Sequence, residues 1–401
     1  MKGGDKMNAG GSIAGRIVGF CSGSSLPAVP VKVHAFFGAV RDSVTNAKGE
    51  YWFSALPPSY YRLYGGGGSY TTDTSTPAIY AGRATEYNFR LYSRKVASPD
   101  SRGQIFPAVF GDRLVWTDLH EGEPNLFCYN TKEHTKHQLT KGAGAKILPR
   151  LWGDMVVWED WRAGAGNSDI FAMNLATKQE LQVTSDPSVQ IMPDIWDTRM
   201  VWVDYRQGAA AIYTRDLRDN REEPLIVGAG DKLAPTIFDN NLAWVDLRTG
   251  VPNIFTYDFS TGKEKQVSPS DLEQFDPKVF GQFLVWTDFR GRRPHIRLHN
   301  LLTGEERRIS REEHGAFSPS LSGDVVVWSD LRNGNPDIYA YDIRRQREFV
   351  IEADPEDQST PAISEKTVAW VDWSTGGPLI AYSTICPERL TIKKKKRRGR
   401  H

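Results

Sequence analysis

The 401-residue sequence has only three cysteines, Cys21, Cys128 and Cys386, which are far apart and show no metal-type spacing. An odd and sparse count predicts neither a disulfide framework nor a zinc site. The sequence also lacks the Gly-x-Ser-x-Gly, Gly-x-Gly-x-x-Gly, His-Glu-x-x-His and P-loop motifs, which mark common catalytic and nucleotide-binding sites. We therefore expect no cofactor and no metal, and we assign no catalytic residue.

Long hydrophobic runs are absent as well. No segment approaches the roughly 18 apolar residues that a membrane-spanning helix needs, so we expect no such helix. The first residues, MKGGDKMNAGGS, contain no apolar core of a secretory signal. Either the protein stays in the cytoplasm, or its export signal lies upstream of this start.

The charges nearly balance, because 50 Lys and Arg face 49 Asp and Glu for a net charge of +1. The C-terminal segment 393–401 is the exception, since its seven positive charges leave −6 on the rest of the chain. Such a tail is a polyanion-binding arm, a nuclear-type address or a solvated end without a role. No aromatic residue interrupts the run, so base stacking is not indicated, and no specific nucleic-acid motif is present. The polyanion-binding candidates are Lys393, Lys394, Lys395, Lys396, Arg397, Arg398 and Arg400.

The sequence contains one long-range repeat. Seven times a proline is followed nine residues later by Trp-x-Asp, and successive tryptophans are 42, 44, 42, 42, 42 and 42 residues apart. A period of roughly 40–45 residues built from short apolar strands is typical of a β-propeller. We assign the repeated pair to blade structure, with the tryptophan packed between blades and the aspartate holding the next turn. These residues are Trp116, Asp118, Trp158, Asp160, Trp202, Asp204, Trp244, Asp246, Trp286, Asp288, Trp328, Asp330, Trp370 and Asp372.

Each repeat predicts four strands. In the sixth repeat they are 317–321, 325–331, 337–342 and 347–351, with a turn rich in Asn, Gly and Pro between the second and the third. The first repeat begins with a full strand at Gln104, and 389–393 has the pattern of a last strand. Seven complete blades therefore fit. We expect the ring to close by contact between the first and the seventh blade, without a strand exchanged between the two ends.

The repeats resemble the TolB-type propeller family, in particular its Val-Trp-x-Asp-x-Arg-x-Gly-Asn-x-Asp-Ile-Tyr subgroup. Val327–Tyr339 (VWSDLRNGNPDIY) matches almost residue for residue, and Val157–Phe171 matches with a two-residue insertion. The resemblance covers about 104–392 and implies a seven-bladed propeller of four-stranded blades. The amino-terminal α/β domain of periplasmic TolB is missing, so no role in the Tol envelope system is implied.

Residues 12–92 follow a different pattern of short alternating segments, at 13–18, 29–37, 50–53, 60–64 and 85–91, which predict β-strands. They resemble the carboxypeptidase regulatory-like, transthyretin-type sandwich family, through Gly11–Val18, Leu26–Val33, Thr45–Phe53, Leu56-Pro57 and Tyr87–Leu91. The run Gly65–Gly68 departs from that family as an unusually loose connection. The resemblance implies a small Greek-key β-sandwich that serves as a spacer or a binding module.

Together the patterns predict an all-β chain with five parts. These are a disordered N-terminus (1–11), the β-sandwich (12–92), a linker (93–103), the propeller (104–392) and the basic tail (393–401). By resemblance, such combinations are common in surface or secreted proteins of bacteria and archaea, which implies an extracellular or cell-surface location.

Function is expected where the repeats differ from one another. The fifth repeat has His295-Ile-Arg-Leu-His-Asn where the sixth has Asp-Ile-Tyr-Ala-Tyr-Asp, and alternate side chains share one strand face. This face is an anion or sugar-acid subsite, an imidazole metal pair, or sequence drift between blades; no carboxylate joins the pair at a readable spacing, so no metal is assigned. The ligand-binding candidates are Arg290, Arg292, Arg293, His295, Arg297 and His299. Further exceptions are His120 and Ser374, which replace the repeated arginine, and Ala209–Ala211 in the third turn.

Basic turns and acidic loops are expected to alternate around one mouth of the central channel, where they form either a merely solvated rim or a polar funnel that binds a carbohydrate, a peptide or a cation. On this basis we expect a non-enzymatic binding or scaffold protein that presents a mixed-charge face to an unknown carbohydrate or protein ligand. The alternative is a polysaccharide lyase or glycosidase at the channel mouth. Such an enzyme would show two carboxylates, or a histidine and a carboxylate, converging in a deep pocket near His295 and His299.

Overall fold

The computed structural model describes residues 10–36, 40–99, 102–120 and 122–386. Every regular element in these residues is a β-strand, which confirms the all-β class. The described residues divide into two compact units: unit 1 holds those up to Ser93 together with Thr384, Ile385 and Cys386, and unit 2 holds those between Arg94 and Ser383.

Unit 2 contains seven four-stranded antiparallel sheets. The first three, in chain order, are β11 (Gln104–Phe110), β12 (Arg113–Asp118), β13 (Asn125–Asn130), β14 (Thr135–Gln138); β15 (Lys146–Trp152), β16 (Met155–Asp160), β17 (Asp169–Asn174), β18 (Gln179–Gln182); and β19 (Gln190–Trp196), β20 (Arg199–Asp204), β21 (Ala211–Asp216), β22 (Arg221–Ile226). The next three are β23 (Lys232–Phe238), β24 (Asn241–Asp246), β25 (Asn253–Asp258), β26 (Lys263–Gln266); β27 (Gln274–Phe280), β28 (Phe283–Asp288), β29 (His295–Asn300), β30 (Glu306–Arg308); and β31 (Ala316–Ser322), β32 (Val325–Asp330), β33 (Asp337–Asp342), β34 (Arg347–Glu352). The last sheet is β35 (Gln358–Ser364), β36 (Thr367–Asp372), β37 (Leu379–Thr384) and β10 (Lys95–Val96).

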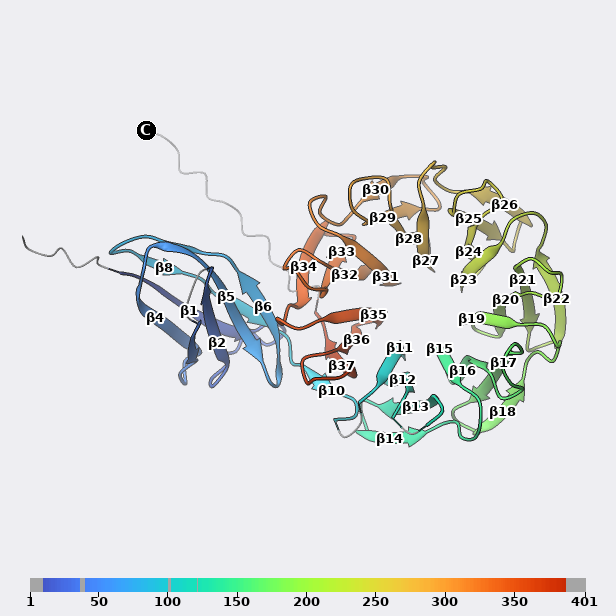
Figure 1. The fold of residues 1–401 in the computed structure, drawn as a ribbon, viewed down its shortest axis with the longest axis horizontal. Helices are drawn as coiled ribbons and strands as arrows, with labels where there is room; N and C mark the ends of the chain where they lie inside the picture. Colours follow the sequence, from blue (N-terminus) through green and yellow to red (C-terminus); the bar gives the residue numbers. More distant parts are fainter. Residues whose placement is uncertain (1–9, 37–39, 100–101, 121, 387–401) are drawn as a thin grey trace, which may run out of the picture. The chain divides into compact units, whose positions relative to one another are not determined.

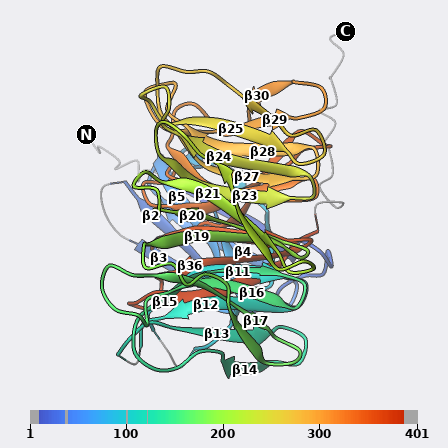
Figure 2. The ribbon, with the colours of Figure 1, turned by 90° about the vertical axis from the view of Figure 1, so that its right-hand side faces the viewer.

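The sheets of unit 2 are arranged in a ring with the first strand of each at the centre (Figure 1). Viewed from the side, most strands of these sheets run roughly in one direction, along the axis of the ring (Figure 2). The second strand is buried along almost its whole length, because both of its faces pack against other sheets. All seven repeated tryptophans are fully buried, and Trp328, for example, packs in a cluster with residues of the fifth sheet such as Val285. The β-propeller architecture is therefore confirmed.

A β-bulge interrupts the pairing of each innermost strand. The register between the first and second strands shifts just before the repeated proline. The residue before the proline takes a positive φ, for example 55° at Phe106 and 53° at Asp276. The bulge leaves this residue out of the ladder and bends the strand, so the repeat places seven bulges around the centre of the ring.

The seventh sheet is completed from the other end of the propeller. β10 pairs with β37 through Lys95↔Tyr382 and Val96↔Ala381. The expected closure without a strand from the opposite end is therefore wrong. The sequence repeat could not reveal this strand because β10 carries no part of the repeated motif, and two of the residues assigned to the linker belong to a sheet. The expected last strand at 389–393, like the basic tail, lies outside the described residues.

Unit 1 consists of two sheets with a common core. One contains β4 (Glu50–Leu56), β1 (Gly11–Gly19), β8 (Ala84–Glu86) and β9 (Phe89–Leu91); the other contains β3 (Val40–Val44), β2 (Pro30–Ala35), β5 (Ser59–Gly67), β6 (Tyr70–Ser75) and β7 (Ala78–Ile79). Side chains from both sheets form one buried cluster, which includes Ile13, Val31 and Phe89. The first residues of the Gly65–Gly68 run continue β5 instead of forming a loose connection. At Gly65 a Cβ atom would lie 2.5 Å from the ring of Phe89, so glycine is required for packing there.

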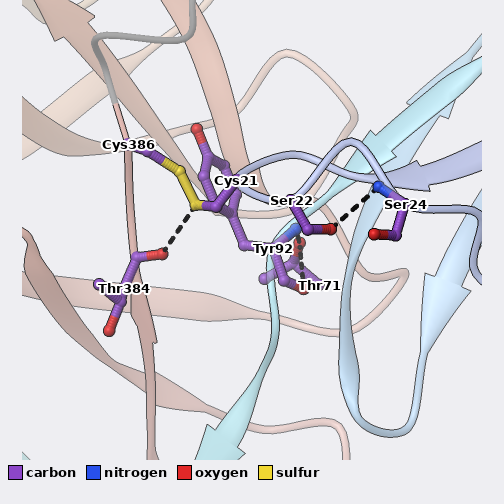
Figure 3. Close-up of a disulfide and its surroundings, with 7 residues drawn as sticks. All are labelled: Cys21, Ser22, Ser24, Thr71, Tyr92, Thr384 and Cys386. Carbon is purple, nitrogen blue, oxygen red and sulfur yellow. Dashed lines mark hydrogen bonds between the residues drawn. A yellow bond between two sulfur atoms is a disulfide. The ribbon is translucent and has the colours of Figure 1, made fainter.

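A disulfide joins Cys21 to Cys386 across a sequence separation of 365 residues, and both cysteines belong to unit 1 (Figure 3). The Cα atoms are 5.7 Å apart, and the Cys21 sulfur lies 3.7 Å from the carbonyl oxygen of Thr384. The expectation that the cysteines form no disulfide is wrong, because distance along the chain does not limit which residues the fold brings together. Cys128 is buried and free.

Candidate functional site

The repeated Trp-x-Asp-x-Arg segment forms a common contact set in five blades, which we call the arginine socket. In the sixth blade the Asp330 carboxylate accepts the Trp328 indole N–H at 2.9 Å, the Arg332 backbone N–H at 3.0 Å and the Arg332 guanidinium at 2.6–2.8 Å. The guanidinium lies 3.7 Å from the centre of the Tyr339 ring and also bonds Glu348 of the fourth strand. The socket therefore combines a buried carboxylate, an aromatic ring and an outer carboxylate around one guanidinium.

Five blades fill this socket from their own turn. The pairs are Arg162–Asp160, Arg206–Asp204, Arg248–Asp246, Arg290–Asp288 and Arg332–Asp330, each with a guanidinium–carboxylate distance of 2.6 Å. In the seventh blade the turn residue is Ser374, and Arg94 next to β10 takes over. Its guanidinium bonds Asp372, and it donates to Ser374 Oγ at 3.1 Å. Ser374 thus replaces the arginine of the turn in sequence, and Arg94, from the other end of the propeller, supplies the guanidinium instead.

The first blade differs from the other six. His120 stands at the arginine position, and a cavity of about 130 Å³ opens beside it. Asp118, Phe127 and Gln138 line this cavity together with His120, Glu123, Asn125 and Lys136. Asp118 accepts the Trp116 indole N–H at 3.3 Å and the His120 backbone N–H at 2.9 Å, as its counterparts do in other blades. The cavity therefore lies where a guanidinium is bound in the other blades.

Four of the six candidates in the fifth blade, Arg290, His295, Arg297 and His299, are brought together around two carboxylates. His295 Nε2 lies 3.6 Å from Asp288 Oδ1, and Arg297 lies 2.9 Å from Glu306 Oε1, which Arg290 also bonds at 2.9 Å. His299 Nδ1 is 4.0 Å from Glu306 Oε2.

Both histidines of this blade are almost fully buried, and burial lowers the pKa of each, so neither presents a charged surface near neutral pH. Arg292 and Arg293 are exposed in the turn and do not join the buried group. A histidine–carboxylate pair thus exists, but inside the blade. The assignment of these residues to a ligand stays a prediction.

Aromatic side chains converge on the axis of the ring at the end of the innermost strands. The Trp152 ring lies 5.8 Å from Trp196 and 5.7 Å from Phe238, which contacts Phe280 at 4.1 Å. Trp152 and Phe238 belong to the second and fourth sheets, which are not neighbours in the ring. Their contact therefore spans the third sheet, and these rings form an aromatic cluster at that end of the innermost strands.

A layer of charged side chains lies next to this cluster, two residues before the aromatic residues on the innermost strands. Lys278 of the fifth sheet is influenced electrostatically by Arg150 of the second sheet and Asp194 of the third, as well as by Asp276. Because these sheets are not adjacent in the ring, the charges face each other across the axis. Lys278, Arg150 and Asp194 are half-buried, and Asp276 is exposed, so solvent reaches the layer. We call these four residues the axial charged layer.

Two causes lower the pKa of Lys278, and two smaller ones raise it. Loss of solvent around the ammonium group and repulsion by Arg150 lower it to about 8, against the attraction of Asp194 and Asp276. Asp194 is held in place, because its Oδ2 accepts the backbone N–H of Ile237 at 2.9 Å.

The sequence analysis missed this layer, although a signal was present. Arg150, Asp194 and Lys278 each follow the repeated proline directly, and the corresponding residues in other repeats are Ala, Thr or Ser.

The described residues offer no obvious metal site. Within them, no three His, Cys, Asp or Glu side chains converge on a common position. The same residues contain no helix that could span a bilayer.

The sequence matches no protein-family model, and no curated protein matches it by sequence. Solved structures do show similarity. An oligogalacturonate lyase in complex with manganese has a TM-score of 0.55 at 13% identity, over 75% of this chain and 95% of that chain. The β-propeller domain of the Trilobed protease from Pyrococcus furiosus has a TM-score of 0.56 at 10% identity, over 71% and 93%. TolB from Acinetobacter baumannii has a TM-score of 0.47 at 15% identity, and the chain spans 63% of its length.

At these identities the similarities show the fold, a β-propeller of the kind the TolB-type repeats predicted. They also correct the expectation of a non-enzymatic scaffold. The neighbours include an oligogalacturonate lyase that matches almost over its full length, and this favours the alternative, an enzyme, over a scaffold. Within the described residues of this chain, no cluster of three His, Cys, Asp or Glu side chains corresponds to a site for the manganese of that neighbour.

Proposed function

We propose that the protein is an exported enzyme that cleaves an anionic oligosaccharide of uronic acids by β-elimination at the propeller axis. The axial charged layer is the observation that carries this proposal. It places an amine with a pKa of about 8 opposite a guanidinium, and it occurs once, whereas the arginine sockets repeat around the ring. A reaction needs one asymmetric group of side chains, and this layer is one.

β-Elimination from a uronic acid needs a base and a cation. The base removes the proton from the carbon that carries the carboxylate, and the cation stabilises the negative charge that develops there. Lys278 as the free amine is the base, and Arg150 binds the carboxylate through its planar fork of N–H groups. The C–H electrons form a carbon–carbon double bond, and the neighbouring C–O bond breaks. The departing oxygen keeps that electron pair and takes a proton from water.

The lowered pKa makes Lys278 competent for this step. At pH 8 about half of an amine with a pKa near 8 is deprotonated, whereas an ordinary lysine with a pKa of about 10.4 is less than 1% deprotonated. A glycoside hydrolase would instead require a protonated carboxyl group beside a carboxylate. The amine in the axial layer thus favours elimination over hydrolysis.

Substrate approaches the layer from the end of the channel opposite the aromatic cluster. Leu119, Phe289 and Trp373 each follow a socket aspartate directly, and they are 42%, 36% and 42% exposed. Apolar and aromatic side chains on this rim provide surfaces for the apolar faces of sugar rings, and the charged layer below them selects an acidic sugar.

The disulfide supports export from the cytosol. Structural disulfides are rare in reducing compartments and common in secreted or periplasmic proteins. Cys21 and Cys386 fix two chain positions 365 residues apart, and this link is retained only where thiols are oxidised. A cell-surface or extracellular location agrees with a polysaccharide substrate.

The test is to incubate the protein with oligogalacturonate, oligomers of other uronic acids and a neutral glucan, and to follow the ultraviolet absorbance of an unsaturated uronate product. We expect absorbance to rise with one acidic substrate and not with the glucan. The initial rate should increase with pH through about 8, as Lys278 loses its proton. Lys278→Met should lower the rate at least a hundredfold, in line with the contribution of a general base.

The matched control is Thr236→Val, at the equivalent position of the fourth repeat, which preserves shape and should leave the rate within twofold. Loss of activity in both variants would mean that the layer is only structural. Cleavage of an acidic oligomer without the unsaturated product would replace elimination by hydrolysis. No cleavage of any uronate oligomer contradicts the proposal.

A further inference from the structure

In the first blade, the cavity occupies the position that an arginine side chain fills in the other six blades. In six blades the socket aspartate bonds an arginine guanidinium, five times from the turn and once from Arg94. In the remaining blade, which is the first, the turn carries His120 instead. This side chain is exposed, and the space beside it forms the cavity. Comparison of the seven blades therefore identifies a guanidinium as the group that occupies this space in the others.

The walls of the cavity retain the features that hold a guanidinium elsewhere. Phe127 corresponds to Phe171, Tyr213, Phe255 and Tyr339, whose rings lie 3.7–4.6 Å from the guanidinium carbon in their blades. Asp118 is buried, and its bonds to Trp116 and to the His120 backbone have counterparts in sockets that also hold an arginine, such as Asp330 with Trp328 and Arg332. These bonds therefore do not compete with a cation. We propose that the first blade binds a guanidinium group from outside the chain, on the Asp118–Phe127 pair.

Two residues differ from those of the other sockets in a way that suits a reversibly bound ligand. Lys136 replaces the outer glutamate of the other blades, donates to Ser98 Oγ at 2.7 Å and lies 5.2 Å from the centre of the Phe127 ring. Glu123, on the turn before the third strand, supplies the second carboxylate instead. Two carboxylates, Asp118 and Glu123, thus line the cavity together with one ammonium group, that of Lys136.

The size of the cavity agrees with such a ligand. A volume of about 130 Å³ is many times the roughly 10–15 Å³ that admits a single water molecule. A guanidinium has four heavy atoms, so it fits together with the start of its alkyl chain. The ligand is either a free guanidino compound or an arginine side chain of a peptide. Both share the chemistry that the socket recognises.

Calorimetric titration of the full chain with agmatine, arginine amide and an arginine-containing peptide tests the proposal. Butylamine provides the charge without the planar fork, and urea provides the plane without the charge. We expect saturable binding at one site per chain for a guanidino probe, at least tenfold tighter than for butylamine, and none for urea. Tighter binding of the peptide than of agmatine assigns the ligand to a partner, and the reverse assigns it to a small molecule.

Two substitutions at one position separate the socket from the histidine. His120→Arg restores the residue of five other blades and should abolish binding, because its own guanidinium fills the cavity. His120→Ala leaves the cavity open and should bind agmatine within threefold of the wild type. Equal loss in both variants would make His120 the ligand-binding group and overturn the proposal. Equal affinity for butylamine and agmatine would overturn it as well.

Discussion

Arg94 is predicted to hold the propeller closed, and Arg94→Met tests this directly. The Arg94 side chain is 12% exposed, and the two carboxylates it contacts, Asp372 and Glu352, are each 1% exposed. Removing one partner of a buried ion pair leaves a carboxylate without its countercharge and costs about 3–5 kcal/mol. We expect a loss of this size in the free energy of unfolding of unit 2, since Arg94 adjoins β10.

The matched comparison is Arg248→Met, in a socket whose arginine is 32% exposed and whose outer partner Glu264 is 38% exposed. Solvent can reach that socket, so the loss there should be about 1–2 kcal/mol, closer to that of a hydrogen bond to a charged group. The measurement is equilibrium unfolding in urea, followed by tryptophan fluorescence, because all seven repeated tryptophans are buried in unit 2.

A repair variant makes this prediction sharper. Arg94→Met combined with Ser374→Arg returns the guanidinium to the seventh socket from the turn, as in five other blades. This double variant should recover at least half of the lost free energy. If Arg94→Met costs less than about 1 kcal/mol, or if the repair recovers nothing, the socket does not contribute to closure in the way described.

Three further predictions concern other parts of the chain. Replacing Cys21 and Cys386 by serine should lower stability by about 2–5 kcal/mol, measured by thermal unfolding with and without reductant; a variant that unfolds like the wild type would contradict a structural role for the disulfide. Burial raises the pKa of Asp337 to about 8, so the folded state keeps a proton that the unfolded state releases, and stability falls as pH rises from about 4 to 8. Asp337→Asn, the residue type found in the first and fourth blades, should therefore raise the melting temperature at pH 8 more than at pH 4; an equal change at both pH values would contradict this assignment. Deleting 393–401 should shift elution from an immobilised polyanion to lower salt, whereas unchanged elution would remove the polyanion-binding interpretation.

The repeated features of this fold can be predicted from the sequence because seven copies reinforce each pattern. The four strands of the sixth repeat were predicted to within two residues of β31, β32, β33 and β34. The pairing of Asp330 with Arg332 follows from their positions at the end of a strand and in its turn. What could not be predicted are the contacts made only once. Arg94 reaches Asp372 across 278 residues, and neither the spacing nor the composition of 93–103 indicates that it supplies a missing arginine.

The candidate site was predictable in part. His120 stood out as an exception to the repeat. The cavity beside it could not be predicted, because it follows from the packing of arginine over an aromatic ring in the other blades, which only the structure shows. The axial layer was overlooked, because only the bulge before each proline and the ring geometry bring Arg150 and Lys278 to opposite sides of one axis. The fifth-blade histidines were candidates because imidazole groups can bind anions or metals. In the structure both side chains are buried inside the blade and do not reach the surface.

The most direct test of the central claim is the mass balance of the products from an acidic oligosaccharide. Elimination at the axial layer adds no water, so the masses of the two products should sum to the mass of the substrate, with one product unsaturated. Hydrolysis would add the mass of one water molecule. Products that sum to the substrate mass in the wild type, and none with Lys278→Met, are the predicted result; a gain of one water, or no product from any uronate oligomer, contradicts the account.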